Sequence, residues 1–279
     1  MPAFHAFDGT ELAYHVRGDG PPLICLPGGP MRASACLGDL GGLSRSRQLV
    51  LLDLRGTGDS ATPADPASYR CDRLVDDVLA LQDHLGLASA DVLGHSAGAN
   101  IAVLYALRHP RRVRSLVLVT PSGRAVGLEP DTELRREIIN LRRDEPWFPG
   151  ASAAFERIAA GQGTEQDWAA TAPFFYGRWD ATAQAYDAAG EGQTNEAAAE
   201  AFGADGAFDP AATRAALASL DSPVLVIGGR LDLQRPPAVT EEYAKLFPNS
   251  RLVAQPGAGH FPWLDDPGQF VSAVTEFLN

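Results

Sequence analysis

Short apolar runs recur along the first half of the chain. They lack the alternation of polar and apolar residues that a half-exposed strand shows, and they are Leu23–Leu26, Leu49–Leu52, Val92–Leu93 and Leu116–Val119. Uninterrupted runs of this kind predict strands that are buried on both faces of a parallel sheet.

Helical periodicity lies between these runs. One apolar stripe with spacings of four, three and four residues is carried by Leu74, Val78, Leu81 and Leu85. A second helix is predicted at Ala99–Arg108, directly after a glycine-rich turn. At the N-terminus, Asp8-Gly9-Thr10 separates Ala3–Phe7 from Leu12–Arg17 and predicts an antiparallel hairpin at a sheet edge. Strands alternating with helices indicate crossover connections and a largely parallel sheet.

The pattern changes after Pro121. Residues 123–213 contain helix-like stretches at Thr132–Arg143 and Glu196–Phe202 but no buried strand. The alternation then resumes with two strands and two helices, namely Val224–Ile227, Pro237–Leu246, Arg251–Ala254 and a last helix ending at Leu278. We therefore expect one α/β core made of residues 1–122 and 214–279, with residues 123–213 inserted as a helical cap.

Charge narrows the range of partners. The chain has a formal net charge of −12, and the predicted cap holds 16 acidic residues against 7 arginines, which is −9 of that total. Nucleic acids and anionic membranes would repel such a surface. No apolar run of about 18 residues is present to span a bilayer. We expect a small-molecule or short-peptide substrate, with the oligomeric state left open.

The N-terminal residues and the cysteines favour a cytoplasmic protein. The N-terminal residues show no basic stretch followed by an apolar core, so no signal peptide is expected. Cys25, Cys36 and Cys71 are an odd number without a CxxC pair, which favours buried reduced thiols over disulfides or a zinc site.

One pentapeptide carries a candidate nucleophile. Gly94-His95-Ser96-Ala97-Gly98 matches the pattern G-x-S-x-G, with a predicted strand before it and a predicted helix after it. The flanking glycines allow a sharp turn that exposes the serine, and the following helix N-terminus favours developing negative charge. Ser96 is the predicted nucleophile.

A serine hydroxyl needs a base to take its proton. Of the six histidines, His260 alone follows a strand through a turn of small residues, Gly257-Ala258-Gly259. Asp232 follows the strand Val224–Ile227 through Gly228-Gly229, whereas Asp221 precedes that strand and would lie at the opposite edge of the sheet. We predict His260 as the base and Asp232 as the acid that orients it.

The negative charge that develops on a substrate oxygen needs two backbone donors. The N–H of Ala97 follows the nucleophile, and the loop Pro27-Gly28-Gly29-Pro30 follows an early strand at the required place. We assign Gly29 and Ala97 to the oxyanion hole.

These residues resemble the α/β-hydrolase superfamily over nearly the whole chain, and within it the proline iminopeptidases. The family's HGGPG loop, DQRGxGxS stretch and GxSxGG elbow correspond here to residues 27–31, 53–60 and 94–99. The sequence departs from these motifs at Pro27, Met31, Leu54 and Ala99. The resemblance implies an α/β-hydrolase fold and a serine hydrolase that releases a small N-terminal residue such as proline or alanine. We interpret the stretch at residues 53–56 as shaping a loop beside the site.

The predicted cap would select the substrate. Its aromatic residues and acids suggest apolar walls with a carboxylate for an ammonium group. For any single ring or acid the structural explanation is favoured, in which the rings form a small core of the cap's own and the carboxylates a solvated face. The candidate substrate-binding residues are Phe174, Phe175, Tyr176 and Trp179. The alternative to the aminopeptidase is an esterase or thioesterase acting on a small or natural-product acyl group. A non-catalytic ligand-binding protein is the third hypothesis. Neither a nucleotide-binding loop nor an HExxH helix is present, so we expect no cofactor and no metal.

Overall fold

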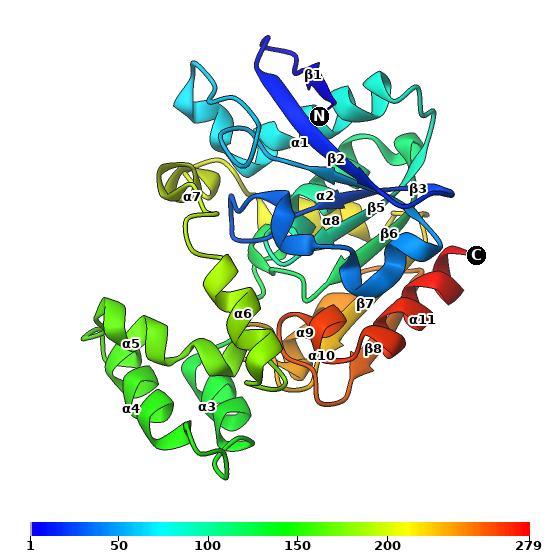
Figure 1. The fold of residues 1–279 in the computed structure, drawn as a ribbon. Helices are drawn as coiled ribbons and strands as arrows, with labels where there is room; N and C mark the ends of the chain where they lie inside the picture. Colours follow the sequence, from blue (N-terminus) through cyan, green and yellow to red (C-terminus); the bar gives the residue numbers. More distant parts are fainter. Residues whose placement is uncertain (1) are drawn as a thin grey trace.

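The structure is a computed structural model, and it describes residues 2–279. Eight strands form one sheet in the order β1-β2-β4-β3-β5-β6-β7-β8 (Figure 1). Their bounds are β1 Ala3–His5, β2 Glu11–Arg17, β3 Pro22–Leu26, β4 Gln48–Leu52, β5 Ala90–His95, β6 Val113–Val119, β7 Val224–Gly229 and β8 Ser250–Gln255. β1 and β2 pair antiparallel, as does β2 with β4, and the remaining pairs are parallel. The predicted N-terminal hairpin and the parallel sheet are confirmed.

The sheet is buried on both faces, as the apolar runs predict. In β4, Val50 and Leu52 join one hydrophobic cluster, while Leu49 and Leu51 join another on the opposite face. Successive side chains of a strand point to opposite faces, so a strand covered on both sides needs apolar residues at every position. The helices that cover the sheet are α1 Cys71–His84, α2 Gly98–Arg108, α9 Pro237–Ala244, α10 Pro262–Asp265 and α11 Pro267–Leu278.

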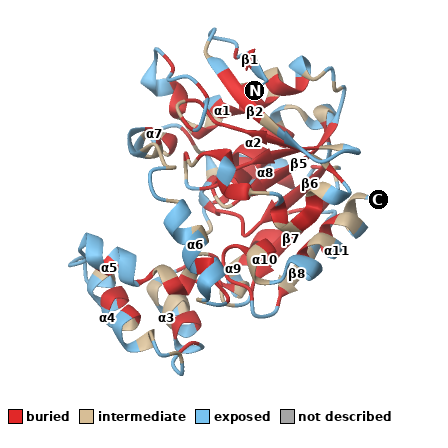
Figure 2. Cartoon of the chain, viewed as in Figure 1, coloured by how far each residue is buried: buried red, intermediate tan, exposed pale blue. Residues whose placement is uncertain are grey.

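Six α-helices and no strand lie between β6 and β7. They are α3 Thr132–Asn140, α4 Phe148–Ala159, α5 Glu165–Ala170, α6 Ala181–Ala189, α7 Glu196–Phe202 and α8 Pro210–Leu217. Figure 1 shows α3, α4 and α5 projecting from one end of the sheet, and Figure 2 shows that their outer faces are exposed. A small hydrophobic cluster, which includes Ile139, Phe155 and Phe174, holds this lobe together.

The last two of these helices belong to the core. Phe202 of α7 and Leu217 of α8 pack in the same cluster as α1 and α2. The predicted cap boundary between residues 213 and 214 falls inside α8. Thus α7 and α8, which include the predicted end of the cap, pack against the core. The division of the chain into core and cap at 122/123 and 213/214 stays a prediction.

Arg55 holds the loop after β4. Its side chain is fully buried and donates to both carboxylate oxygens of Asp77 in α1, with Nη1 also donating to Asp8. Gly58, in the same loop, lies against the Asp53 carboxylate, where a Cβ would come within 2.2 Å of Oδ2. These contacts support the loop-shaping interpretation of residues 53–56. Within residues 2–279, no helix has the length and apolar character needed to cross a membrane.

Candidate active site

Ser96 occupies the sharp turn between β5 and α2. Its φ of 50° lies in the left-handed region, which an L-residue adopts only where the surroundings hold it. Its backbone N–H donates to the carbonyl of Val119 at 2.9 Å, which ties the turn to β6. A Cβ on Gly98 would lie 2.4 Å from the carbonyl oxygen of Leu26, so only glycine fits there. The close packing of helix against strand therefore sets where the hydroxyl stands.

The loop after β3 lies directly against this turn. A Cβ on Gly28 would come within 2.9 Å of the Cβ of Ser96, so the loop needs glycine to approach the serine. Gly29 and Ala97 line the same cavity as Ser96. Neither of their backbone N–H groups donates a hydrogen bond to another group of residues 2–279. Two free donors beside the serine are what an oxyanion hole requires.

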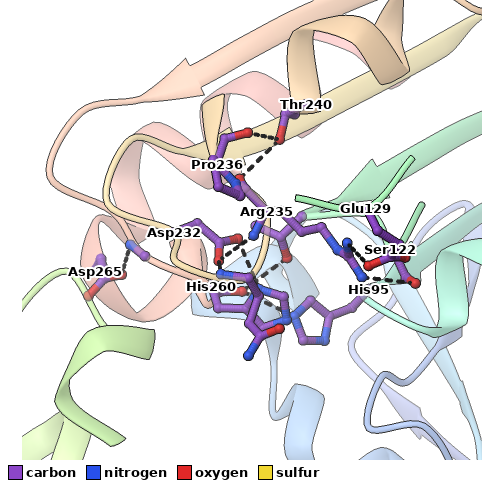
Figure 3. A network of polar contacts seen from close by, with 12 residues as sticks. His95, Ser122, Glu129, Asp232, Arg235, Pro236, Thr240, His260 and Asp265 are labelled. Carbon is purple, nitrogen blue, oxygen red and sulfur yellow. Dashed lines mark hydrogen bonds and ion pairs between the residues drawn. The ribbon is translucent and has the colours of Figure 1, made fainter. Parts of the chain in front are cut away.

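His260 and Asp232 form a buried hydrogen-bonded pair (Figure 3). Asp232 Oδ2 lies 2.9 Å from His260 Nδ1, and the aspartate is fully buried. The other oxygen, Oδ1, accepts from the backbone N–H groups of Gln234 at 2.8 Å and Arg235 at 3.0 Å. The carboxylate is thus fixed on both oxygens. Its bond to Nδ1 favours the tautomer in which Nε2 is free to accept a proton.

The backbone of His260 is held by three neighbours. Its N–H donates to the carbonyl of Phe175 at 2.7 Å, and its carbonyl accepts from Thr120 Oγ1 at 3.0 Å. The ring of His95 completes the set, with Nε2 at 3.1 Å from the same carbonyl. Burial lowers the pKa of His95 well below its usual range, with His260 and Arg32 adding to the effect, so its neutral ring donates from Nε2. The sequence pattern predicts this positioning role for neither Thr120 nor His95.

Ser96 and His260 line one cavity without a hydrogen bond between their side chains. Catalytic hydrogen bonds are often long before substrate binds and tighten in the complex. The fold therefore brings together the turn and the two carboxyl-end loops that the sequence predicts, while Asp221 lies before β7, at the opposite edge of the sheet.

Comparisons with known proteins identify the family. Residues 21–267 match the model of a family described as the alpha/beta hydrolase fold. The chain belongs to the α/β-hydrolase family. It is 27% identical to a proline iminopeptidase from Heyndrickxia coagulans over 276 residues, which cover 94% of this chain and 92% of that protein.

Two further relatives carry other activities. A 2-hydroxymuconate semialdehyde hydrolase from Pseudomonas sp. (strain CF600) is 27% identical, over 97% of this chain and 91% of its own length. The structure of an esterase from Rhodococcus sp. ECU1013 matches with a TM-score of 0.70 and 26% identity, covering 99% of this chain and 98% of that one. The resemblance to α/β-hydrolases and proline iminopeptidases is confirmed, and the protein is a hydrolase.

The cavity of this α/β-hydrolase has a volume of about 640 Å³, which suits a small-molecule ligand. Of the four candidate substrate-binding residues, Phe175 and Tyr176 line it, together with Trp168 of α5. Phe174 and Trp179 do not. Phe174 is 2% exposed because it packs in the small core of the lobe, edge-on to Trp147. Trp179 packs instead against Tyr176, with ring centroids 5.3 Å apart.

Arg235 and Ser122 also line the cavity, and sequence reasoning missed both. Arg235 donates from Nη1 to Glu129 at 2.9 Å and from Nη2 to Ser122 Oγ at 3.1 Å (Figure 3). The Ser122 N–H in turn donates to the carbonyl of Ser96. No motif marks these positions, because their roles depend on loops from different strands meeting in space.

One cluster has the donor types of a metal site. His15 Nε2, Asp53 and Asp59 place ligand atoms within 4.8 Å of one another. Hydrogen bonds within the protein account for it: Asp53 accepts from the N–H groups of Ser34 at 2.8 Å and Asp59 at 3.0 Å, and contacts His15 at 2.9 Å. The cluster thus helps to fold the loop after β4.

Proposed function

We propose that the protein is a serine hydrolase that cleaves small carboxylic esters through an acyl-enzyme on Ser96. The observation that carries the proposal is the buried Asp232–His260 pair, 2.9 Å between Oδ2 and Nδ1, on the cavity that holds Ser96 at its strained turn. In this proposal His260 Nε2 takes the proton of the Ser96 hydroxyl as Oγ bonds to the carbonyl carbon. The N–H groups of Gly29 and Ala97 stabilise the resulting oxyanion.

The intermediate then collapses and breaks the bond to the leaving alcohol, which receives the proton from His260. A water molecule attacks the acyl-enzyme with His260 again as base. This step frees the acid and returns the proton to Ser96 Oγ.

An aminopeptidase that releases proline or alanine is the second candidate. The similarity to a proline iminopeptidase and the shared loop and elbow motifs favour it. The charge of the cavity opposes it, because an ammonium group needs a carboxylate partner. Among the cavity-lining residues of the described chain, 2–279, Asp187 is the one acidic side chain, and it accepts a hydrogen bond from the Tyr176 hydroxyl at 2.9 Å. We therefore place the ester hydrolase first.

The test combines one variant with a substrate panel. Ser96→Ala removes the nucleophile, and in subtilisin the loss of the catalytic serine lowers kcat by about 10⁶-fold. We expect short-chain aryl esters to be cleaved by the wild-type protein and not by the variant, with unchanged circular dichroism. Retention of more than about one per cent of the activity would contradict the triad.

The panel separates the candidates. It consists of short-chain esters, prolyl and alanyl arylamides, and N-blocked versions of both arylamides. Cleavage of the free arylamides alone would establish the aminopeptidase. Absence of turnover, together with no labelling of Ser96 by a fluorophosphonate, would identify a non-catalytic ligand-binding protein, since such a protein need not activate its serine.

A further inference from the structure

The charge of the cavity lining is opposite to that of the chain. Among the lining residues, Arg32, Arg124 and Arg235 are set against one carboxylate, that of Asp187, giving a formal +2 with histidines left aside. The whole chain carries −12. A positive cavity in a negative protein concentrates a field of one sign where the substrate enters.

Two of these arginines have no acidic partner within residues 2–279. Arg32 donates from Nε to the side-chain oxygen of Gln193 at 2.9 Å, and its guanidinium lies 5.4 Å from the centre of the Tyr186 ring. Arg124 lies 5.8 Å from the centre of the Phe208 ring. Neutral partners position these side chains without cancelling their charge.

Arg235 is the most deeply placed of the three. It is 8% exposed, and its Nε has no hydrogen-bond partner within residues 2–279 although it is buried. Its pairing with Glu129 leaves that donor unused. Because Glu129 already pairs with Arg235, Arg32 and Arg124 are the cavity-lining arginines whose charge is left for a ligand.

From this lining we infer that the substrate of the proposed hydrolase carries a carboxylate, which the guanidinium groups of Arg32 and Arg124 bind. The inference rests on the proposed function for its reaction and extends it to the substrate class. Guanidinium groups pair with carboxylates through two parallel hydrogen bonds, which gives orientation as well as affinity. The same field repels an ammonium group, such as the free amino terminus of a peptide.

The kinetic test uses two acetate esters that differ in charge at one position, 3-acetoxybenzoate and its neutral amide, 3-acetoxybenzamide. We expect the wild-type protein to favour the anionic ester in kcat/KM. Arg124→Gln removes a charge-assisted hydrogen bond and should lower the anionic-to-neutral ratio by roughly tenfold or more. Charge reversal by Arg124→Glu should lower it further, and Arg32→Gln in combination should add to the loss.

Arg111→Gln is the matched control. Arg111 is exposed in the turn before β6, at the opposite edge of the sheet from Ser96, and its loss changes the net charge equally. A ratio that stays within about twofold of wild type in Arg124→Gln and Arg124→Glu, or that falls equally in Arg111→Gln, would overturn the inference.

A binding measurement keeps this inference separate from the proposed catalysis. By calorimetry, 3-hydroxybenzoate should bind the wild-type protein more tightly than 3-hydroxybenzamide. Arg124→Gln should reduce the difference, and Arg32→Gln combined with Arg124→Gln should abolish it. This binding result would support the carboxylate site even if neither ester were cleaved. Absence of cleavage would count against the proposed hydrolase activity and not against the carboxylate site. Equal binding of the two compounds, or tighter binding of inorganic phosphate, would overturn the carboxylate assignment.

Discussion

Replacing Asp232 with asparagine changes one atom at a position where the structure fixes the side chain's orientation. Oδ1 accepts two backbone N–H groups, from Gln234 and Arg235, while Oδ2 faces His260 Nδ1. An asparagine will keep its oxygen toward the two donors. The flipped amide would leave both N–H groups without an acceptor, which costs about 1–3 kcal/mol for a buried one such as that of Arg235.

The amide nitrogen therefore faces the imidazole. Because that nitrogen donates, His260 Nδ1 must accept, and the single ring proton moves to Nε2. A protonated Nε2 cannot take the proton of Ser96. In the trypsin-type triad this substitution lowers kcat by about 10⁴-fold, which corresponds to about 5.4 kcal/mol in the barrier. We expect a loss of the same order here.

The assay is kcat/KM for a short-chain aryl ester at neutral pH, with the melting temperature measured on the same samples. Asp221→Asn is the control, because it removes the same charge from an exposed position just before β7. We expect Asp232→Asn to stay folded and lose its activity, and we expect Asp221→Asn to keep its activity. A loss of less than about tenfold in folded Asp232→Asn would refute the tautomer argument.

Two further predictions concern the fold around the site. Arg55→Met leaves the fully buried Asp77 without its guanidinium partner, so the free energy of unfolding should drop by about 3–5 kcal/mol. The control is Arg108→Met, which should lose less than about 1 kcal/mol because its pair with Asp76 is exposed. Burial already raises the pKa of Asp77 to about 6, and loss of Arg55 raises it further, so the free energy of unfolding of Arg55→Met should fall as the pH rises from about 4 to 8. Urea unfolding at several pH values measures both the loss of stability and its pH dependence. Equal losses of stability in Arg55→Met and Arg108→Met would contradict the burial argument. Burial raises the pKa of all three thiols, that of Cys36 to about 11. At pH 8 a disulfide reagent should therefore modify the thiols of the native protein slowly, and it should modify three thiols per chain once guanidinium chloride unfolds the protein. Rapid modification of one thiol in the native protein would show that its site opens.

The sheet and the nucleophile turn could be predicted because their determinants are local. An uninterrupted apolar run such as Leu49–Leu52 identifies a strand covered on both faces, and the glycines around Ser96 permit a turn that no other residue allows. Asp232 and His260 could be found because each follows a strand at the same edge of a parallel sheet. Chain order and strand polarity together were enough to bring them to one place.

The aromatic residues of the lobe show where local reasoning fails. Phe174 and Phe175 are adjacent in a 3₁₀ helix, yet Phe174 packs into the lobe's small core and Phe175 lines the cavity. Which of two neighbours faces the substrate depends on the angle at which the lobe meets the core. That angle is set by contacts from other segments, such as the hydrogen bond from the N–H of His260 to the carbonyl of Phe175.

Charge is misleading in the same way, and with larger consequences for function. The segment 123–213 is strongly acidic, which suggests a carboxylate for an ammonium group. Several of its acids have other roles: Asp131, Asp180 and Asp209 cap helix N-termini, and Asp167 pairs with Arg157. Net charge counts every residue equally, whereas a cavity responds only to the few charges that face it without a partner. Because two of those are the guanidinium groups of Arg32 and Arg124, the site of an acidic protein favours an acidic substrate.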